Sequence, residues 1–151
     1  MSSVQLQRWL CGALLVSLNG CEPSPAARDT YRPEFPPILV ASSEQMQELI
    51  ETSERPVVVE FGVDIGCARC DEMRSQVAEL AQELKGAASV VRVDYNANRQ
   101  LAAQYGATIC PSYVIFQQGQ IVSTRTYPTS ADMIRIDLSL AQNQSTTETG
   151  P

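Results

Sequence analysis

The feature that most constrains this 151-residue chain is a pair of cysteines, Cys67 and Cys70, that follows an apolar run and a short loop. The run, Val57–Phe61 (VVVEF), is apolar except for Glu60, as expected of a strand buried on both faces. The cysteines then fall in the first turn of a predicted helix, whose positive end favours a thiolate at the first of them. Two cysteines at this spacing can close a small disulfide and reopen it. The pattern therefore predicts a redox-active pair.

Charge and residue types exclude several other chemistries. The formal net charge is −6, and no basic block is present to neutralise phosphates, so we expect no nucleic-acid partner. The chain has no histidine, which removes imidazole both as a general base and as a metal ligand. Any proton transfer must therefore use carboxylates, thiols, tyrosine, lysine or water.

The first residues have the pattern of an export signal. Arg8 provides a positive start, and Trp9–Leu18 is a mostly apolar run that is too short to span a bilayer. Such a run is typical of a signal peptide, and we assign residues 1–20 to one. A buried N-terminal helix is the alternative.

The stretch Leu18–Cys21 (LNGC) resembles a bacterial lipobox. This resemblance implies cleavage before Cys21, which then becomes lipidated and anchors the chain to a membrane. Cleavage near Ala26 by the ordinary signal peptidase is the alternative. The proline-rich residues 21–37 predict an extended tether. We therefore expect an exported protein of the bacterial periplasm or cell envelope, held there through Cys21.

The remaining residues predict one folded domain at 38–142 and a polar, disordered tail at 143–151. A helix is predicted after each of the first three strands, and a last helix after Ser130. The helix that begins at the cysteines is predicted to continue to Lys85. The predicted strands lie at 38–40, 57–61, 88–95, 112–117 and 120–126. This order, β-α-β-α-β-α-β-β-α, predicts an α/β fold with a central mixed β-sheet flanked by helices.

Two motifs and this order of elements resemble the thioredoxin family over residues 38–142. The first motif is the cysteine pair after a buried strand, and the second is Tyr105–Ser112 (YGATICPS), followed by an apolar run. The resemblance implies a thioredoxin-like fold in which Pro111 follows a cis peptide bond and faces the active-site disulfide. It also implies that the backbone at Cys110 and Pro111 holds the substrate.

The resemblance also implies a role for each residue near the pair. Cys67 would attack a substrate disulfide, and Cys70 would resolve the mixed disulfide. Glu60 matches a buried carboxylate with a raised pKa that accepts the Cys70 proton. Arg69 stands where thioredoxins usually have proline; a cation there should stabilise the Cys67 thiolate and make the disulfide a stronger oxidant.

The resemblance implies a protein-disulfide oxidoreductase that acts on protein thiols and disulfides without an organic cofactor. A membrane electron donor or oxidant would reset its disulfide, and the direction of electron flow stays open. Gly66 replaces the usual tryptophan and Tyr127–Pro128 replaces a glycine of the substrate groove, which favours a dedicated partner. Two alternatives remain. In the first, Cys67, Cys70 and Cys110 together bind a soft metal such as copper or an iron–sulfur cluster. In the second, the domain is a non-catalytic interaction module with a static disulfide.

Overall fold

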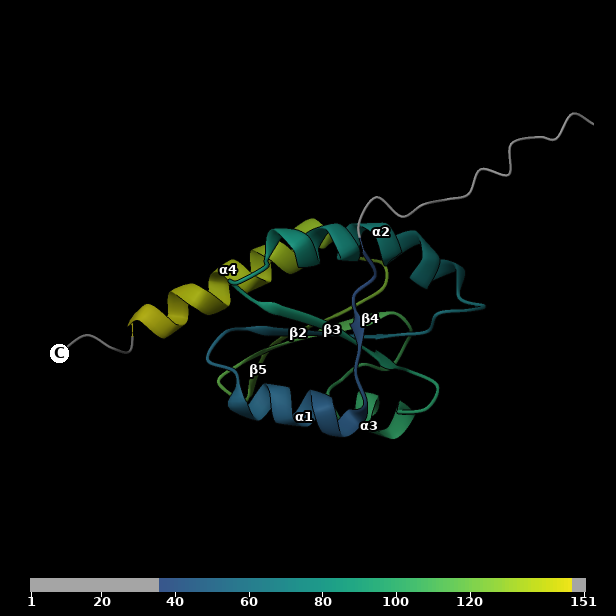
Figure 1. Ribbon diagram of the computed structural model, residues 1–151, viewed down its shortest axis with the longest axis horizontal. Helices are drawn as coiled ribbons and strands as arrows, with labels where there is room; N and C mark the ends of the chain where they lie inside the picture. The colour runs from purple at the N-terminus through teal and green to yellow at the C-terminus, as the bar shows by residue number, and fades with distance from the viewer. Residues whose placement is uncertain (1–35, 148–151) are drawn as a thin grey trace, which may run out of the picture. The chain divides into compact units, whose positions relative to one another are not determined.

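A computed structural model of the chain describes residues 36–147, and their elements follow the predicted order (Figure 1). The strands are β1 (Leu39–Val40), β2 (Val57–Gly62), β3 (Ser89–Asp94), β4 (Ser112–Gln117) and β5 (Gln120–Thr126). The helices are α1 (Ser43–Thr52), α2 (Ala68–Glu83), α3 (Arg99–Gln104) and α4 (Ala131–Thr147). The α/β fold with a mixed sheet is thus confirmed.

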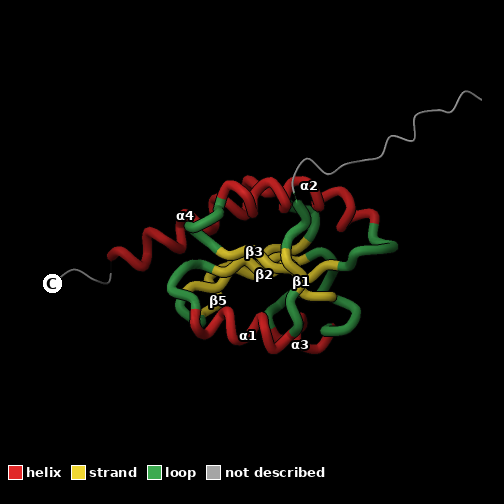
Figure 2. Tube along the Cα trace, in the orientation of Figure 1, coloured by secondary structure: helices red, strands yellow, loops and turns green. Residues whose placement is uncertain are grey.

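The five strands form one sheet in the order β1-β3-β2-β4-β5, with β2 at its centre. The strands β1, β3 and β2 run parallel, whereas β4 pairs antiparallel with both β2 and β5. Figure 2 shows the sheet as a middle layer, with α2 and α4 on one face and α1 and α3 on the other. Helices on both faces explain why every residue of β2 is buried, as its apolar run predicts.

Each face of the sheet has its own hydrophobic core. Towards α1 and α3, Phe61 packs in a cluster with Met46 and Phe116. Towards α2 and α4, Tyr113 packs in a second cluster with Met73 and Ile134. Removing a large apolar side chain from water contributes about 1.5–3 kcal/mol. The two cores therefore fix the ends of β2 and β4, which position the cysteines.

The helix ends differ from the sequence prediction in two places. Helix α2 ends at Glu83 rather than at Lys85. Helix α4 continues to Thr147, so residues 143–147 are helical although we predicted a disordered tail from residue 143. A polar run without glycine or proline can extend a helix that is already formed, because each added residue contributes one more backbone hydrogen bond. Within residues 36–147, none of the helices combines the length and apolar character needed to cross a membrane.

The pairing of β2 with β4 brings the two sequence motifs together. Phe61 near the end of β2 lies opposite Ser112 at the start of β4. The loop after β2 leads to the cysteine pair, and the residues directly before Ser112 are Cys110 and Pro111. An antiparallel register of this kind places both motifs at the same edge of the sheet.

Candidate active site

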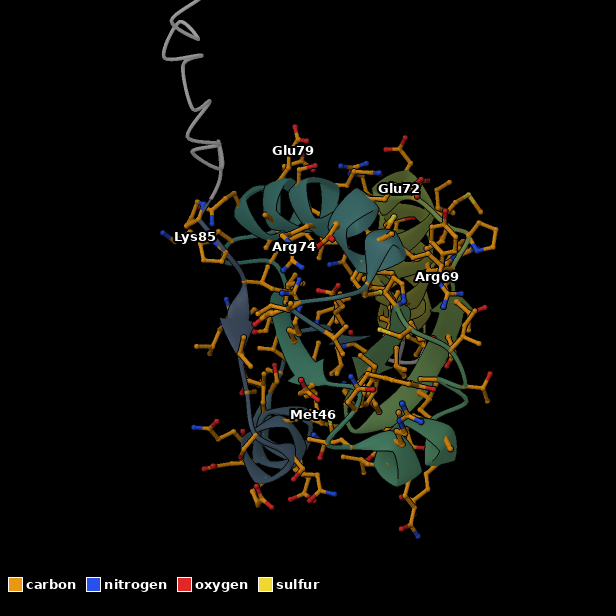
Figure 3. The ribbon with its side chains drawn as sticks, turned by 90° about the vertical axis from the view of Figure 1, so that its right-hand side faces the viewer. Met46, Arg69, Glu72, Arg74, Glu79 and Lys85 are labelled. Carbon is orange, nitrogen blue, oxygen red and sulfur yellow. A yellow bond between two sulfur atoms is a disulfide. The ribbon has the colours of Figure 1, made fainter. Side chains whose placement is uncertain are left out.

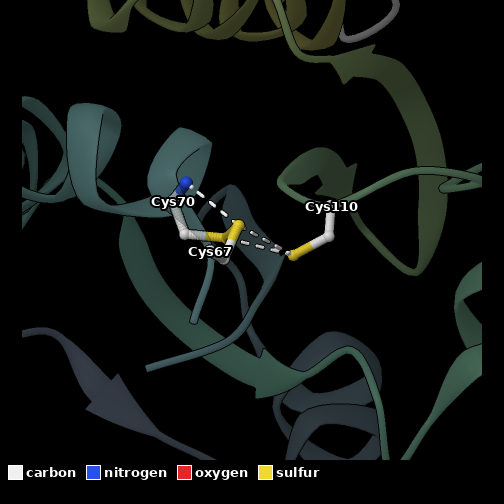
Figure 4. A group of neighbouring side chains, drawn as sticks. All are labelled: Cys67, Cys70 and Cys110. Carbon is white, nitrogen blue, oxygen red and sulfur yellow. Dashed lines mark hydrogen bonds between the residues drawn. A yellow bond between two sulfur atoms is a disulfide. The ribbon is translucent and has the colours of Figure 1, made fainter. Parts of the chain in front are cut away.

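The cysteine pair lies at the N-terminus of α2 and forms a disulfide, as the sequence predicts (Figure 4). The Cα atoms of Cys67 and Cys70 are 5.2 Å apart. Cys67 is the N-cap residue of α2, and its Sγ accepts a hydrogen bond from the backbone N–H of Cys70 at 3.1 Å. Cys70 is completely buried, whereas Cys67 is half-buried. Cys67 is therefore the sulfur that a substrate can reach, and the helix N-terminus supports its thiolate.

A third sulfur, that of Cys110, faces the pair from the start of β4 (Figure 4). Its Sγ lies 3.1 Å from Sγ of Cys70 and 3.9 Å from Sγ of Cys67. Partial burial raises the pKa of the Cys110 thiol, and the negative charge of Glu60 acts in the same direction, while Arg69 opposes it. Cys110 therefore stands as a neutral thiol beside the disulfide.

The cis peptide bond predicted before Pro111 is present. The carbonyl oxygen of Pro111 accepts a hydrogen bond from the backbone N–H of Tyr127 at 3.1 Å. A second cis bond, between Tyr127 and Pro128, lies just beyond that contact, and sequence reasoning missed it. The end of β5 is thereby tied to the segment that faces the cysteines.

Glu60 is fully buried in β2, as predicted. Burial raises the pKa of its carboxyl, and the nearby guanidinium of Arg92 partly offsets this shift. The hydroxyl of Tyr113 also points to it, at 3.5 Å from Oε1. A Cβ at Gly62 would lie 3.0 Å from the same oxygen, so glycine leaves room for the carboxyl group. A raised pKa is the property that the predicted proton acceptor requires.

Arg92 is the main residue of this region that sequence reasoning missed. It lies directly opposite Glu60 across β2 and β3, and its Nε and Nη2 donate to Oε2 of Glu60 at 3.0 and 2.9 Å. Its Nη1 donates to Asp64 in the loop before Cys67 at 2.5 Å. Arg74 of α2 donates to the same carboxylate at 3.2 Å. A signal was present in the sequence, because Glu60 in β2 and Arg92 in β3 are charges of opposite sign, each directly flanked by apolar residues.

Arg69 has a different environment from the one that its predicted role suggests. Its guanidinium lies over the ring of Tyr127, 5.8 Å from the centroid, and the Tyr127 hydroxyl donates to Glu72 at 2.7 Å. Figure 3 shows Arg69 and Glu72 at the same end of α2. Its charge still reaches the site, because it lowers the pKa of the Cys110 thiol. The predicted effect on the Cys67 thiolate stays a prediction.

A surface cleft of about 410 Å³ opens beside Cys67. Its lining includes two cations, an aromatic ring, apolar side chains and two sulfurs, among them Arg69, Arg99, Tyr95, Ile109, Cys67 and Cys110. The structure thus brings together Cys67, Arg69 and Cys110 at the cleft, with Cys70 in contact with Cys110, whereas Glu60 is buried in β2 and does not line the cleft. Cys21, the predicted lipidation site, lies outside the described residues.

An exchangeable disulfide with one accessible sulfur, set against a cis-proline segment at the edge of a mixed sheet, defines the class of protein-disulfide oxidoreductases. The comparison with known families makes the assignment more specific. The sequence model described as Thioredoxin matches residues 37–139, and the chain belongs to the thioredoxin family.

Individual relatives agree with this assignment. Thioredoxin 1 of Nostoc sp. is 37% identical over 83 residues, which cover 55% of this chain and 76% of that protein. Thioredoxin 1 of Synechococcus elongatus is 37% identical over 78 residues, covering 52% and 71%. Among solved structures, Fasciola hepatica thioredoxin has a TM-score of 0.57 and 25% identity, covering 69% of this chain and 98% of that one. A mutant thioredoxin from Halobacterium salinarum, with a TM-score of 0.60 and 23% identity, covers 70% and 89% and shows the shared fold.

Proposed function

We propose that the chain is an exported, lipid-anchored thiol–disulfide oxidoreductase that exchanges disulfides with a dedicated protein partner at the bacterial cell envelope. The observation that carries the exchange is the unequal exposure of the two cysteines, with Cys67 at the cleft and Cys70 buried behind it. A substrate sulfur therefore meets Cys67 first. Export and anchoring are supported by the signal pattern of residues 1–20 and by Cys21.

The exchange proceeds in two displacement steps. The Cys67 thiolate attacks one sulfur of a substrate disulfide, and the other substrate sulfur leaves as a thiolate and takes up a proton. The Cys70 thiol then loses its proton and attacks Sγ of Cys67, which releases the first substrate sulfur as a thiolate. The Cys67–Cys70 disulfide forms, and two electrons pass to the substrate. In reverse, the same steps oxidise a substrate dithiol. Glu60 is the proposed acceptor of the Cys70 proton, because burial raises the pKa of its carboxyl and a carboxylate with a raised pKa is a stronger base.

The cleft supports a partner with acidic and apolar residues beside its reactive cysteine. Arg69 and Arg99 line it, and Ile65 in the adjacent loop is 91% exposed. A partner that covers the Ile65 side chain would gain from removing its apolar surface from water. The backbone at Cys110 and Pro111 is proposed to hold the substrate chain while its sulfur reacts with Cys67.

A membrane electron donor or oxidant is the proposed redox partner, because each exchange leaves the Cys67–Cys70 pair in the wrong state for the next one. Arg69 and the N-terminus of α2 both place positive charge near the thiols. A stabilised thiolate favours the reduced protein, so the proposed direction is oxidation of substrate dithiols.

The reduction potential of the Cys67–Cys70 pair tests the exchange and its direction. The full chain is equilibrated with glutathione or dithiothreitol buffers, its thiols are trapped, and mass spectrometry follows Cys110 separately. An oxidant should have a potential nearer about −120 mV than the roughly −270 mV of thioredoxin. A value near −270 mV would reverse the proposed direction, and the absence of a reversible transition would reject the exchange itself.

Trapping in cells tests the partner and the anchor. A Cys70→Ser chain cannot resolve its mixed disulfides, so covalent complexes with the partner should accumulate through Cys67. The control, Cys67→Ser with Cys70→Ser, should give none. Cys21→Ser should move the protein from the membrane fraction to the soluble fraction; retention in the membrane would show that Cys21 is not the anchor.

A further inference from the structure

The three sulfurs of the site form a compact group that the exchange reaction alone does not explain. Cys67 and Cys70 come from the N-terminus of α2 and Cys110 from the start of β4, and the three Sγ atoms lie within 4.8 Å of one another (Figure 4). Exchange needs only the first two cysteines. The third sulfur therefore requires its own account.

Cys110 is poorly placed to attack the disulfide. A displacement at Cys70 needs the attacking sulfur on the extension of the bond to Cys67. With an approach of 3.1 Å and an S–S bond of about 2.05 Å, an in-line Cys110 would lie about 5 Å from Cys67. The actual distance is 3.9 Å. Cys110 thus lies beside the bond, and the three sulfurs describe a triangle.

A triangle of sulfurs suits a shared metal once the disulfide is reduced. Metal–thiolate bonds of about 2.3 Å in a trigonal plane put the sulfurs about 4 Å apart. The separation between Cys67 and Cys110 already has this value, at 3.9 Å. Reduction removes the bond between Cys67 and Cys70, which frees both side chains to rotate and lets the other two edges of the triangle lengthen.

The ligand set selects the metal. No other aspartate, glutamate or cysteine within residues 36–147 joins the three thiols, and the chain contains no histidine. Structural zinc sites need four protein ligands, and iron–sulfur clusters are held by four cysteines. Three soft thiolates without a fourth ligand suit Cu(I).

The surroundings of the triangle also suit a small cation held by thiolates. The cleft of about 410 Å³ is lined by Cys67 and Cys110 and gives access from solvent. The N-terminus of α2 and the Arg69 guanidinium offset the negative charge that three thiolates bring. The carboxylate of Glu60 is already paired with Arg92.

We propose that the reduced protein binds one Cu(I) ion through Cys67, Cys70 and Cys110. In this step Cu(I) replaces the protons of three thiols, and no electron moves. The two electrons that first open the disulfide come from a dithiol substrate of the exchange reaction. Oxidation of the pair removes two ligands, so disulfide formation releases the metal.

Competition with a chromophoric chelator tests the proposal. The full chain is reduced, desalted without oxygen and titrated into Cu(I) held by bathocuproine disulfonate. The reduced protein should withdraw one Cu(I) per chain, and the oxidised protein should withdraw none at this site. Cys110→Ser should weaken the affinity by at least about 100-fold, because loss of a supporting residue alone costs 10–100-fold. Cys11→Ser and Cys21→Ser are the matched controls and should leave the affinity unchanged.

X-ray absorption of the copper complex provides a second readout that does not depend on a variant. Three sulfur neighbours are expected in the wild-type protein and two in Cys110→Ser. A cooperative unfolding transition of Cys110→Ser in urea shows that the variant is folded. Equal affinity in wild type and Cys110→Ser, or two sulfur neighbours in the wild-type complex, would overturn the proposal and leave the oxidoreductase function intact.

Discussion

Two pairs of arginines flank the active site, and the protein uses them in different ways. Arg92 and Arg74 lie behind the cysteines and form ion pairs with Glu60, Asp64 and Asp71. Arg69 and Arg99 line the cleft in front, and neither forms an ion pair within the part of the chain that the structure describes. In Figure 3, Arg74 lies beneath α2 on the side of the sheet, whereas Arg69 lies at the end of the helix.

The difference separates what builds the site from what meets a partner. A buried arginine needs a carboxylate, because an unpaired charge in the interior is costly. The pair behind the cysteines therefore fixes the loop before Cys67 through Asp64. The cleft arginines instead contact the aromatic rings of Tyr127 and Tyr95, both at 5.8 Å, and keep their charge available at the surface.

The largest expected effect is a loss of stability when the ion pair between Arg92 and Glu60 is broken. Arg92→Met leaves Glu60 buried without its partner, which should lower the free energy of unfolding by about 3–5 kcal/mol. Arg99→Met, the matched control from the cleft, should change it by no more than about 0.5 kcal/mol. Urea unfolding of the disulfide form measures both. Similar losses of unfolding free energy in the two variants would show that the buried and the cleft arginines do not differ in their contribution to stability.

The ion pair between Glu60 and Arg92 also shows which parts of the structure could be predicted from the sequence and which could not. The buried strand, the helix that begins at the cysteines and the cis bond before Pro111 are all evident from local patterns and motif resemblance. The contact between Glu60 and Arg92 is not local, since it depends on the register of β2 against β3. Buried charges of opposite sign in two strands indicate a pair only after those strands are known to be neighbours.

The cleft arginines should control substrate preference. Two cystine peptides of equal length are compared as substrates, one with aspartates and one with lysines beside the cystine. Wild type should prefer the acidic peptide in kcat/KM, and Arg99→Glu should reduce the ratio about tenfold through lost charge complementarity. The ratio cancels any change in the reactivity of Cys67. A ratio that is independent of residue 99 and of salt would remove the cleft from substrate recognition.

The contacts made by Arg69 and Cys110 were harder to predict, because they depend on the directions of the side chains. Arg69 lies over the ring of Tyr127, the residue that follows β5, and this contact could not be predicted from the sequence. Cys110 is evident from the sequence as a third thiol, but its approach to both cysteines, at 3.1 Å from Cys70 and 3.9 Å from Cys67, follows from the pairing of β2 with β4. Neither the stacking partner nor the sulfur triangle is encoded in the spacing of the residues concerned.

Ile65 provides a further test of whether residues at the cleft contact the partner without contributing to stability, and its expected effect is smaller. It is 91% exposed in the loop before Cys67, so Ile65→Ser should leave the free energy of unfolding within about 0.5 kcal/mol of wild type. A partner that covers the side chain should lose at most about 1.5–3 kcal/mol of binding, the value for complete burial of an isoleucine. The yield of mixed disulfides trapped in Cys70→Ser cells, with and without Ile65→Ser, measures this loss. An unchanged yield would place the partner elsewhere.

The pH dependence of stability tests the protonation state of the Glu60 carboxyl. Burial raises the folded-state pKa of Glu60 above its ordinary value of 4.5. Below pH 4.5 Glu60 is protonated in both the folded and the unfolded chain, and its contribution to stability is fully present. As the pH rises, the unfolded chain releases this proton first, so the contribution is lost as the pH rises through the folded pKa.

Glu60→Gln cannot titrate at this position and supplies the matched reference. Urea unfolding of both proteins is measured from pH 4 to pH 8, and the difference in unfolding free energy between wild type and Glu60→Gln should fall as the pH rises. All other titrating groups cancel in this difference. A difference that instead rises with pH would mean that Arg92 outweighs burial and holds Glu60 ionised. Glu60 would then serve only as the ion-pair partner of Arg92 and would not accept the Cys70 proton.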